Sequence, residues 1–219
     1  MKLQDKLDAF KAHFETKVAT PEVVEIFHRT MAELIATGQA ERALKVGDVA
    51  PTFKLVNAEG ELVSSGQMLE QGPLVVTFYR GVWCPYCNID LQAIEESIEE
   101  IRALGAQLVA VSMQTPENSL KSQRQNKLSY PILTDAGGKT ADAFGIRWRL
   151  QDELIDVHKG FNIDLAVING EPSWTLPMPA RYVIGRDGKI AYAEVSPDYT
   201  KRPDPSELLP VLRALAGGV

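Results

Sequence analysis

The stretch Phe78-Tyr79-Arg80-Gly81-Val82-Trp83-Cys84-Pro85-Tyr86-Cys87 decides the fold, and it contains both cysteines of the chain. The apolar run that leads into it, residues 74–79, predicts a short buried strand. After it, isoleucine and leucine recur at helical spacing as far as Gly105, which predicts a long helix that ends there. The two cysteines therefore lie where a strand ends and a helix begins.

A Cys-x-x-Cys pair at the start of a helix has a direct chemical consequence. The unpaired N–H groups and the positive end of the helix dipole favour thiolate over thiol. We therefore expect Cys84 to be the more acidic and more exposed sulfur, and Cys87 to be its buried resolving partner. Residues i and i+3 of a first turn also lie within the Cα separation that a disulfide spans, roughly 4.4–6.8 Å.

A zinc site and an inert pair of thiols are the other interpretations of these cysteines. Structural zinc needs about four ligands, and the chain has no second cysteine pair and no histidines at ligand spacing among His13, His28 and His158. Inert cysteines would pack as small hydrophobic side chains. The strand–Cys-x-x-Cys–helix context favours a redox-active dithiol without metal or cofactor. We expect the histidines to be surface or packing residues, although His158 lies in a segment that could fold over the site.

The composition is that of an ordinary globular protein, with 219 residues, 45% hydrophobic content and a net charge of −6. That charge argues against general binding to nucleic acid or to an anionic membrane. No stretch approaches the roughly 18 apolar residues of a membrane span, and residues 1–6 lack the apolar region of a secretory signal. We therefore expect a cytoplasmic protein, in which a cysteine pair is more often catalytic than structural.

Residues 1–43 predict an N-terminal helical extension. Apolar side chains from Leu3 to Phe14 recur at helical spacing. Thr20 and Pro21 are typical of an N-cap and a first helical residue, and Gly38 ends the second helix. The extension is expected to pack on the flank of the main domain, or alternatively to form a dimerisation arm, so a homodimer is possible.

Residues 44–219 predict the main domain, in which strands alternate with helices. Residues 46–55 open it with part of a small hairpin, residues 107–112 predict a second core strand, and residues 181–195 predict a terminal hairpin with an Asp-Gly turn before a last helix. The irregular segment at about 147–177 predicts a partly helical insertion. This order indicates a three-layer α/β fold with a central mixed β-sheet.

In these residues the chain resembles the thioredoxin-fold proteins of the alkyl hydroperoxide reductase/thiol-specific antioxidant group, in particular their peroxiredoxin-like branch. The resemblance rests on Gly-Asp-Val-Ala-Pro-Thr-Phe-Lys-Leu at residues 47–55, on Phe-Tyr-Arg at 78–80, and on Ala-Arg-Tyr-Val-Ile at 180–184 followed by Asp187-Gly188. It covers the chain from about residue 44 onward and implies a thioredoxin-like three-layer fold.

One departure from that family concerns its peroxide-attacking cysteine, which typically stands in Pro-x-x-x-Thr-x-x-Cys. With that cysteine matched to Cys87, Arg80 takes the proline position and Cys84 the threonine position. With it matched to Cys84, Thr77 and Gly81 take those positions instead. The motif is preserved in neither alignment, so the resemblance leaves open which cysteine attacks.

A second departure lies before the strand at 180–184. Pro179 stands where the family typically has an arginine, and thioredoxins have a cis-proline at this point. The resemblance thus implies a peroxiredoxin-like frame around a thioredoxin- or glutaredoxin-like dithiol centre. It also implies that the Met178–Pro179 bond is cis and that its backbone lies against Cys84. For Arg181, an outward orientation along a strand edge is favoured over one toward the site.

The residues around the cysteines have several possible supporting roles. Arg80 could lower the pKa of Cys84 or orient a peroxide, or form a structural salt bridge. Trp83 could shield the thiolate and form a docking surface, or simply pack. Pro85 and Tyr86 are expected to tune the redox potential.

The favoured function is a thiol-dependent redox enzyme, a peroxiredoxin-like peroxidase that reduces hydroperoxides through a Cys84/Cys87 dithiol–disulfide cycle. Thioredoxin, glutaredoxin or glutathione would then reduce the disulfide. The first alternative is a thioredoxin/glutaredoxin-like thiol–disulfide oxidoreductase acting on protein or glutathione disulfides. The second is a non-enzymatic redox-sensing binding protein. All three share the dithiol and differ in its oxidant or partner.

Overall fold

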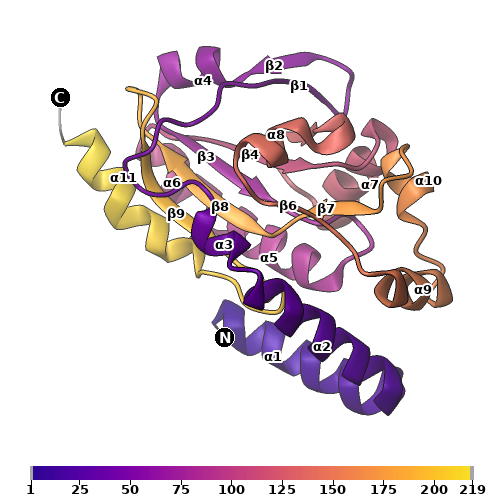
Figure 1. Ribbon diagram of the computed structural model, residues 1–219. Helices are drawn as coiled ribbons and strands as arrows, with labels where there is room; N and C mark the ends of the chain where they lie inside the picture. Colours follow the sequence, from indigo (N-terminus) through magenta and orange to yellow (C-terminus); the bar gives the residue numbers. More distant parts are fainter. Residues whose placement is uncertain (1, 218–219) are drawn as a thin grey trace.

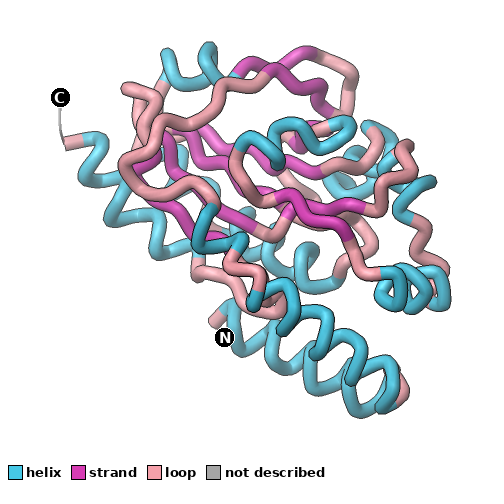
Figure 2. The backbone as a smooth tube through the Cα atoms, viewed as in Figure 1, coloured by secondary structure: helices cyan, strands magenta, loops and turns pink. Residues whose placement is uncertain are grey.

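The computed structural model describes residues 2–217, whose strands form a seven-stranded sheet and a separate two-stranded ribbon. The order in the sheet is β2-β1-β5-β4-β3-β8-β9; the three central strands run parallel and their neighbours antiparallel. The predicted central mixed sheet is thus confirmed, and Figure 2 shows its strands in magenta. The bounds are β1 Lys54–Asn57, β2 Leu62–Ser64, β3 Leu74–Phe78, β4 Gln107–Ser112, β5 Ile132–Thr134, β8 Ala180–Ile184 and β9 Ile190–Val195.

Helices cover both faces of the sheet and complete the predicted three layers (Figure 1). One face carries α1 Leu3–His13, α5 Pro85–Glu96, α6 Ile98–Ala103, α7 Pro116–Asn126 and α11 Leu208–Ala216. The other face carries α3 Gln39–Arg42, α4 Ser65–Gln71 and α8 Lys139–Ala143. Two short 3₁₀ turns are η2 Ala136–Gly138 and η3 Pro205–Glu207. Every side chain of β3 is buried, so this strand lies in the centre of the core.

The long helix predicted after the cysteines is broken into α5 and α6. Ser97 separates them with φ −105° and ψ 0°, outside the helical region. Ile94 before the break and Ile98 and Ile101 after it are all buried, so the apolar pattern continues across the break. The apolar repeat therefore predicted one helix where the structure has two, because both helices bury the same face.

The N-terminal residues form helices as predicted. After α1, a π-helical turn, η1 Phe14–Val18, leads to α2 Pro21–Ala36, whose first turn is capped by the Thr20 hydroxyl, which accepts a hydrogen bond from the Val23 N–H. α1 packs on α5 (Figure 1). α2 packs on α9, Asp152–Gly160. The helices thus lie on the flank of the sheet domain, and the domain boundary at residue 43 stays a prediction.

Residues 147–177 contain the predicted helices and also an antiparallel ribbon that was not predicted. The helices are α9 and α10 Leu165–Asn169, and the ribbon pairs β6 Arg147–Arg149 with β7 Thr175–Pro177. Strands this short and this far apart in sequence give no local signal. Among residues 2–217, none of the helices combines the length and apolar character that crossing a bilayer requires.

Candidate dithiol site

The two cysteines lie at the junction of β3 and α5, as predicted. Cys84 is the N-cap of α5 with extended dihedrals (φ −93°, ψ 108°), and Pro85 is the first helical residue. Both cysteines are free thiols. Gly81 allows the tight turn before them: its φ is +149°, and an added Cβ would lie 2.5 Å from the indole nitrogen of Trp83.

The exposed sulfur expected at Cys84 is not observed, because both cysteines are buried. Cys84 is 1% exposed and Cys87 0%, because α1 and the side chains of Tyr86 and Tyr199 cover this end of α5. The two differ in another respect, since Cys84 borders a cavity and Cys87 is not among the residues that line it.

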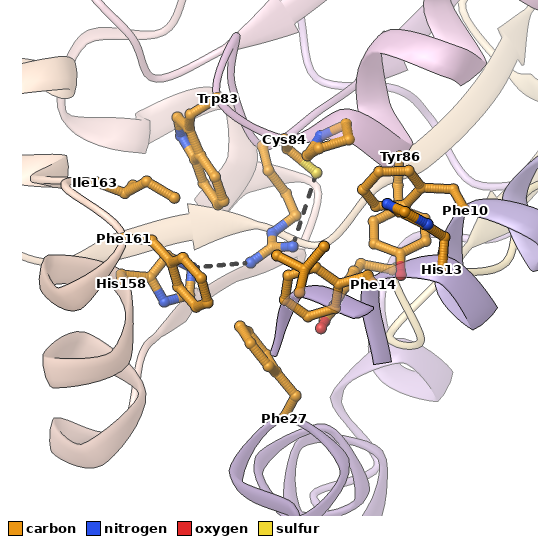
Figure 3. A pocket seen from close by; sticks show the side chains of 14 residues that line it. Phe10, His13, Phe14, Phe27, Trp83, Cys84, Tyr86, His158, Phe161 and Ile163 are labelled. Carbon is orange, nitrogen blue, oxygen red and sulfur yellow. Dashed lines mark hydrogen bonds between the residues drawn. The ribbon is translucent and has the colours of Figure 1, made fainter. Parts of the chain in front are cut away.

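Arg80 supplies positive charge to Cys84 from within the core. Its Nη1 lies 3.8 Å from the Cys84 Sγ and its Nη2 lies 3.4 Å from the His158 Nε2, contacts that Figure 3 marks with dashed lines. The guanidinium carbon lies 4.7 Å from the ring centre of Trp83 and 4.1 Å from that of Tyr199. Cation–π contacts therefore hold a 3% exposed cation. No carboxylate of residues 2–217 forms a salt bridge with it, so the geometry favours the electrostatic role over the structural one.

His158 comes from α9 and fixes the other side of Arg80. Its Nδ1 lies 2.7 Å from the Leu154 carbonyl oxygen, which can only accept, so Nδ1 carries the proton and Nε2 accepts from Arg80. Burial first, and then the charge of Arg80, lower the pKa of His158 to about 4. The imidazole is therefore neutral at physiological pH. Among the three histidines, His158 was the one whose segment was expected to be able to fold over the site.

Cys87 is in contact with a buried ion cluster on the far side of the turn. The Arg202 Nη2 and the Arg80 backbone nitrogen each lie 3.5 Å from its Sγ. The Asp90 carboxylate lies 3.6 Å from the Arg202 Nε and 2.7 Å from the Arg181 Nη2. Arg202 and Asp90 were not predicted. Asp90 does have a sequence signal, because it interrupts the apolar face of a helix three residues after Cys87.

These surroundings give the two thiols opposite acidities. Burial acts to raise the pKa of Cys84, but the neighbouring Cys87 thiol and the charges of Arg80 and Arg202 outweigh it and lower the pKa to about 6. Burial, and then the adjacent Cys84, raise the pKa of Cys87 well above that of a free cysteine. The expectation that Cys84 is the more acidic sulfur agrees with this arrangement.

The predicted cis bond at Met178–Pro179 is wrong, since no peptide bond within residues 2–217 is cis. The chain passes in extended form from β7 to β8: the Met178 N–H donates to the Ile146 carbonyl, and the Pro179 carbonyl accepts from the Ser196 N–H, both at 2.8 Å. Met178 packs in the cluster on the opposite face of the sheet from Cys84. Its backbone is therefore not placed to bind a partner at the dithiol.

The outward orientation favoured for Arg181 is also wrong, because its side chain is 2% exposed. β8 is not an edge strand, since β9 pairs with it on the outer side. Arg181 therefore points toward α5, where it binds Asp90 and donates to the Pro203 carbonyl at 3.0 Å. It contacts the dithiol only through the ion cluster.

A cavity of about 450 Å³ borders Cys84, and Figure 3 shows its aromatic walls. The predicted supporting residues Trp83, Pro85 and Tyr86 line it. Other lining residues are far away from the cysteines in sequence: Phe10, His13, Phe14, Val18, Phe27, Phe161, Ile163 and Tyr199. The helical periodicity of the sequence had placed Phe10 and Phe14 on the apolar face of a helix, without showing that this face borders a cavity. Within residues 2–217, no three His, Cys, Asp or Glu side chains come together as a metal site.

The chain is similar to known proteins both in sequence and in fold. A family model described as AhpC/TSA family matches residues 46–193. Peroxiredoxin Bcp of Escherichia coli is 27% identical over 103 residues, 47% of this chain and 65% of the relative. Thiol-disulfide oxidoreductase ResA of Halalkalibacterium halodurans is 32% identical over 123 residues, 54% of this chain and 68% of the relative. The crystal structure of Peroxidoxin BcpB from Mycobacterium tuberculosis superimposes with a TM-score of 0.62 at 23% identity, over 78% of this chain and 97% of that one.

Proposed function

This chain belongs to the AhpC/TSA family, and we propose that it is an oxidoreductase that reduces hydroperoxides through a Cys84/Cys87 dithiol–disulfide cycle. The observation that carries the proposal is the position of Cys84. Its sulfur, with a pKa lowered to about 6, lies beside a buried guanidinium and borders a cavity that a substrate can occupy. The AhpC/TSA frame and the likeness to proteins described as peroxiredoxins support the choice of a peroxide as oxidant.

In the first step the Cys84 thiolate attacks one oxygen of the hydroperoxide. The S–O bond forms as the O–O bond breaks, sulfur is oxidised to a sulfenic acid, and the other oxygen leaves as an alcohol or water after taking up a proton. Negative charge develops on that leaving oxygen. The Arg80 guanidinium, held by two rings and by His158, is placed to stabilise it without rearranging.

In the second step Cys87 attacks the sulfenic sulfur, so that the S–S bond forms and water leaves. Cys87 must lose its proton in this step, and Arg202 at 3.5 Å stabilises the developing thiolate. A thiol donor then reduces the disulfide with two electrons. We propose thioredoxin, glutaredoxin or glutathione as that donor and the cytoplasm as the compartment; a homodimer stays a prediction.

A thiol–disulfide oxidoreductase is the second candidate. The Cys-Pro-Tyr-Cys centre and the 32% identity to a protein described as a thiol-disulfide oxidoreductase favour it. The 1% exposure of Cys84 weighs against it, because a protein disulfide reaches a sulfur less easily than a small peroxide does.

Stopped-flow tryptophan fluorescence separates the two candidates, because Trp83 packs against the guanidinium that contacts Cys84. Reduced protein is mixed with hydrogen peroxide, cumene hydroperoxide or glutathione disulfide, with Cys84→Ser as the control. We expect both hydroperoxides to oxidise the protein much faster than they oxidise free cysteine. Peroxide rates no faster than those of free cysteine, together with rapid oxidation by glutathione disulfide, would favour the second candidate.

A further inference from the structure

One wall of the cavity beside Cys84 is built by residues that precede the family-matched region. Phe10, Phe14, Val18 and Phe27 all precede residue 46, where the match begins. They come from α1, η1 and α2, which Figure 1 shows in indigo beside the sheet domain. The dithiol thus belongs to the shared frame, whereas much of the wall in front of it belongs to the N-terminal helices.

Aromatic contacts join these helices to α9 around the cavity. The ring of Phe14 lies 5.8 Å from that of Phe27 at 71°, and 5.9 Å from that of Phe161 at 47°. Phe27 in turn lies 6.0 Å from the His158 ring at 64°. Tilted and edge-on geometries at these separations are favourable aromatic packing. The neighbouring segments η1 and α2 therefore form one aromatic wall with the distant end of α9, which Figure 3 shows facing Cys84.

The arginine of the cavity lies at its reactive end. The Arg80 guanidinium contacts the Cys84 sulfur on one side and His158 on the other. None of the lining residues is aspartate, glutamate or lysine. At the outer end, Val18 is 53% and Phe161 37% exposed, so the cavity meets solvent between η1 and the end of α9. A fitting ligand therefore has an uncharged apolar body and one polar end.

The size of the cavity excludes a tight fit for the smallest oxidant. About 450 Å³ lies within the range of small-molecule sites, whereas hydrogen peroxide would touch few of the rings at a time. A compact aryl group would contact several rings edge-on or face-on and would displace water from them. A flexible linear chain would lose rotational freedom on binding without the ring contacts.

We propose that this cavity binds compact aryl-bearing hydroperoxides and that the N-terminal helices set the preference for them over hydrogen peroxide. The inference rests on the proposed peroxidase function. The aryl group packs against the wall that Phe14, Phe27 and Phe161 form together, with the peroxide oxygens at Cys84 and Arg80. The chemical step is the one described above, with an aryl-bearing alcohol as the leaving product.

The test compares kcat/KM for cumene hydroperoxide, n-octyl hydroperoxide and hydrogen peroxide in the wild type and in Phe27→Ala. We expect the wild type to prefer cumene hydroperoxide over both others. Phe27→Ala should lower the cumene-to-hydrogen-peroxide ratio by at least about tenfold through KM, as expected for lost apolar contacts in a pocket. Ile35→Ala is the matched control, because Ile35 is on the same helix, exposed and away from the cavity. Phe14→Leu replaces Phe27→Ala if the latter fails to fold.

A binding measurement keeps this inference separate from the proposed function. 2-Phenyl-2-propanol, the alcohol that cumene hydroperoxide leaves, is titrated into reduced protein by calorimetry. Binding of the alcohol that weakens in Phe27→Ala and not in Ile35→Ala supports the aryl site, whether or not the protein turns over hydroperoxides. Absence of hydroperoxide turnover would overturn only the peroxidase proposal. An unchanged substrate ratio in Phe27→Ala, equal preference for the linear hydroperoxide, or no binding of the alcohol overturns the inference.

Discussion

The two sides of the first turn of α5 differ more than three residues of sequence would indicate. Cys84, in extended N-cap conformation, faces an aromatic cavity and a guanidinium held between two rings. Cys87, inside the helix, faces Arg202, whose charge is shared with Asp90. Each sulfur has an arginine, but only the one at Cys84 lacks a carboxylate partner among the described residues. The pair thus separates a reactive thiolate from a protonated partner within one helical turn.

The largest effect should come from removing each sulfur in turn. Cys84→Ser should abolish oxidation by peroxide, because the remaining thiol has a raised pKa and does not border the cavity. Cys87→Ser should keep the first step and accumulate a sulfenic acid on Cys84, which dimedone traps for mass spectrometry. A sulfenic acid formed in Cys84→Ser and absent from Cys87→Ser would reverse the two roles.

The next effect concerns the ion cluster behind Cys87. Asp90→Asn leaves Arg181 and Arg202 buried without their carboxylate, and breaking a buried ion pair in this way costs about 3–5 kcal/mol. We therefore expect a large loss in the free energy of unfolding of the reduced protein, measured by urea denaturation. Asp8→Asn is the control, since its salt bridge with Lys201 is about half exposed and should contribute little. Equal losses in the two variants would show that the cluster does not stabilise the fold.

Arg202→Met should slow the second chemical step more than the first, because Arg202 contacts Cys87 and contributes less than Arg80 to the lowered pKa of Cys84. Without the guanidinium, the pKa of Cys87 rises further, less of the thiolate forms, and disulfide closure should slow about tenfold. Quenched-flow trapping with dimedone measures the lifetime of the sulfenic acid. Lys201→Met, a neighbouring exposed cation, should leave that lifetime unchanged. A slowed first step with normal closure would assign Arg202 to Cys84 instead.

The sequence predicted those features of the dithiol site that depend on residues close together in the chain. An apolar run, a Cys-x-x-Cys pair and a helical repeat indicate the β3–α5 junction, because each depends on residues close together in the chain. The terminal hairpin follows similarly from its Asp-Gly turn. The acidity expected for Cys84 came from the same helix start.

The long-range partners had no such signal. Arg202 lies 115 residues from Cys87, and only the fold brings them together. The family resemblance misled at Met178–Pro179, where the chain has to run straight from the ribbon into the sheet. The outward orientation favoured for Arg181 failed because β9 takes the edge position. The aromatic walls contain residues that periodicity indicated, but periodicity does not show that a helix faces a cavity.

The smallest expected effect tests how Arg80 is held at Cys84. His158→Phe keeps a ring of similar size against Trp83 and Phe27 but removes the nitrogen that accepts from Arg80. Because the pKa of His158 is about 4, the wild-type imidazole is neutral above about pH 5, so the substitution removes a hydrogen-bond acceptor and no charge. The guanidinium then loses one fixed contact, its field at Cys84 weakens, and the pKa of Cys84 rises.

The rate of iodoacetamide alkylation at Cys84, followed against pH, measures this change. The wild-type midpoint should lie near pH 6, below that of a free cysteine at about 8.5. Arg80→Met should raise it by about one unit, and His158→Phe by less. In the Arg80→Met background, His158→Phe should add nothing, because the histidine acts on the thiolate only through Arg80. An additive shift in the double variant would show that His158 influences Cys84 by another route, such as access through the cavity.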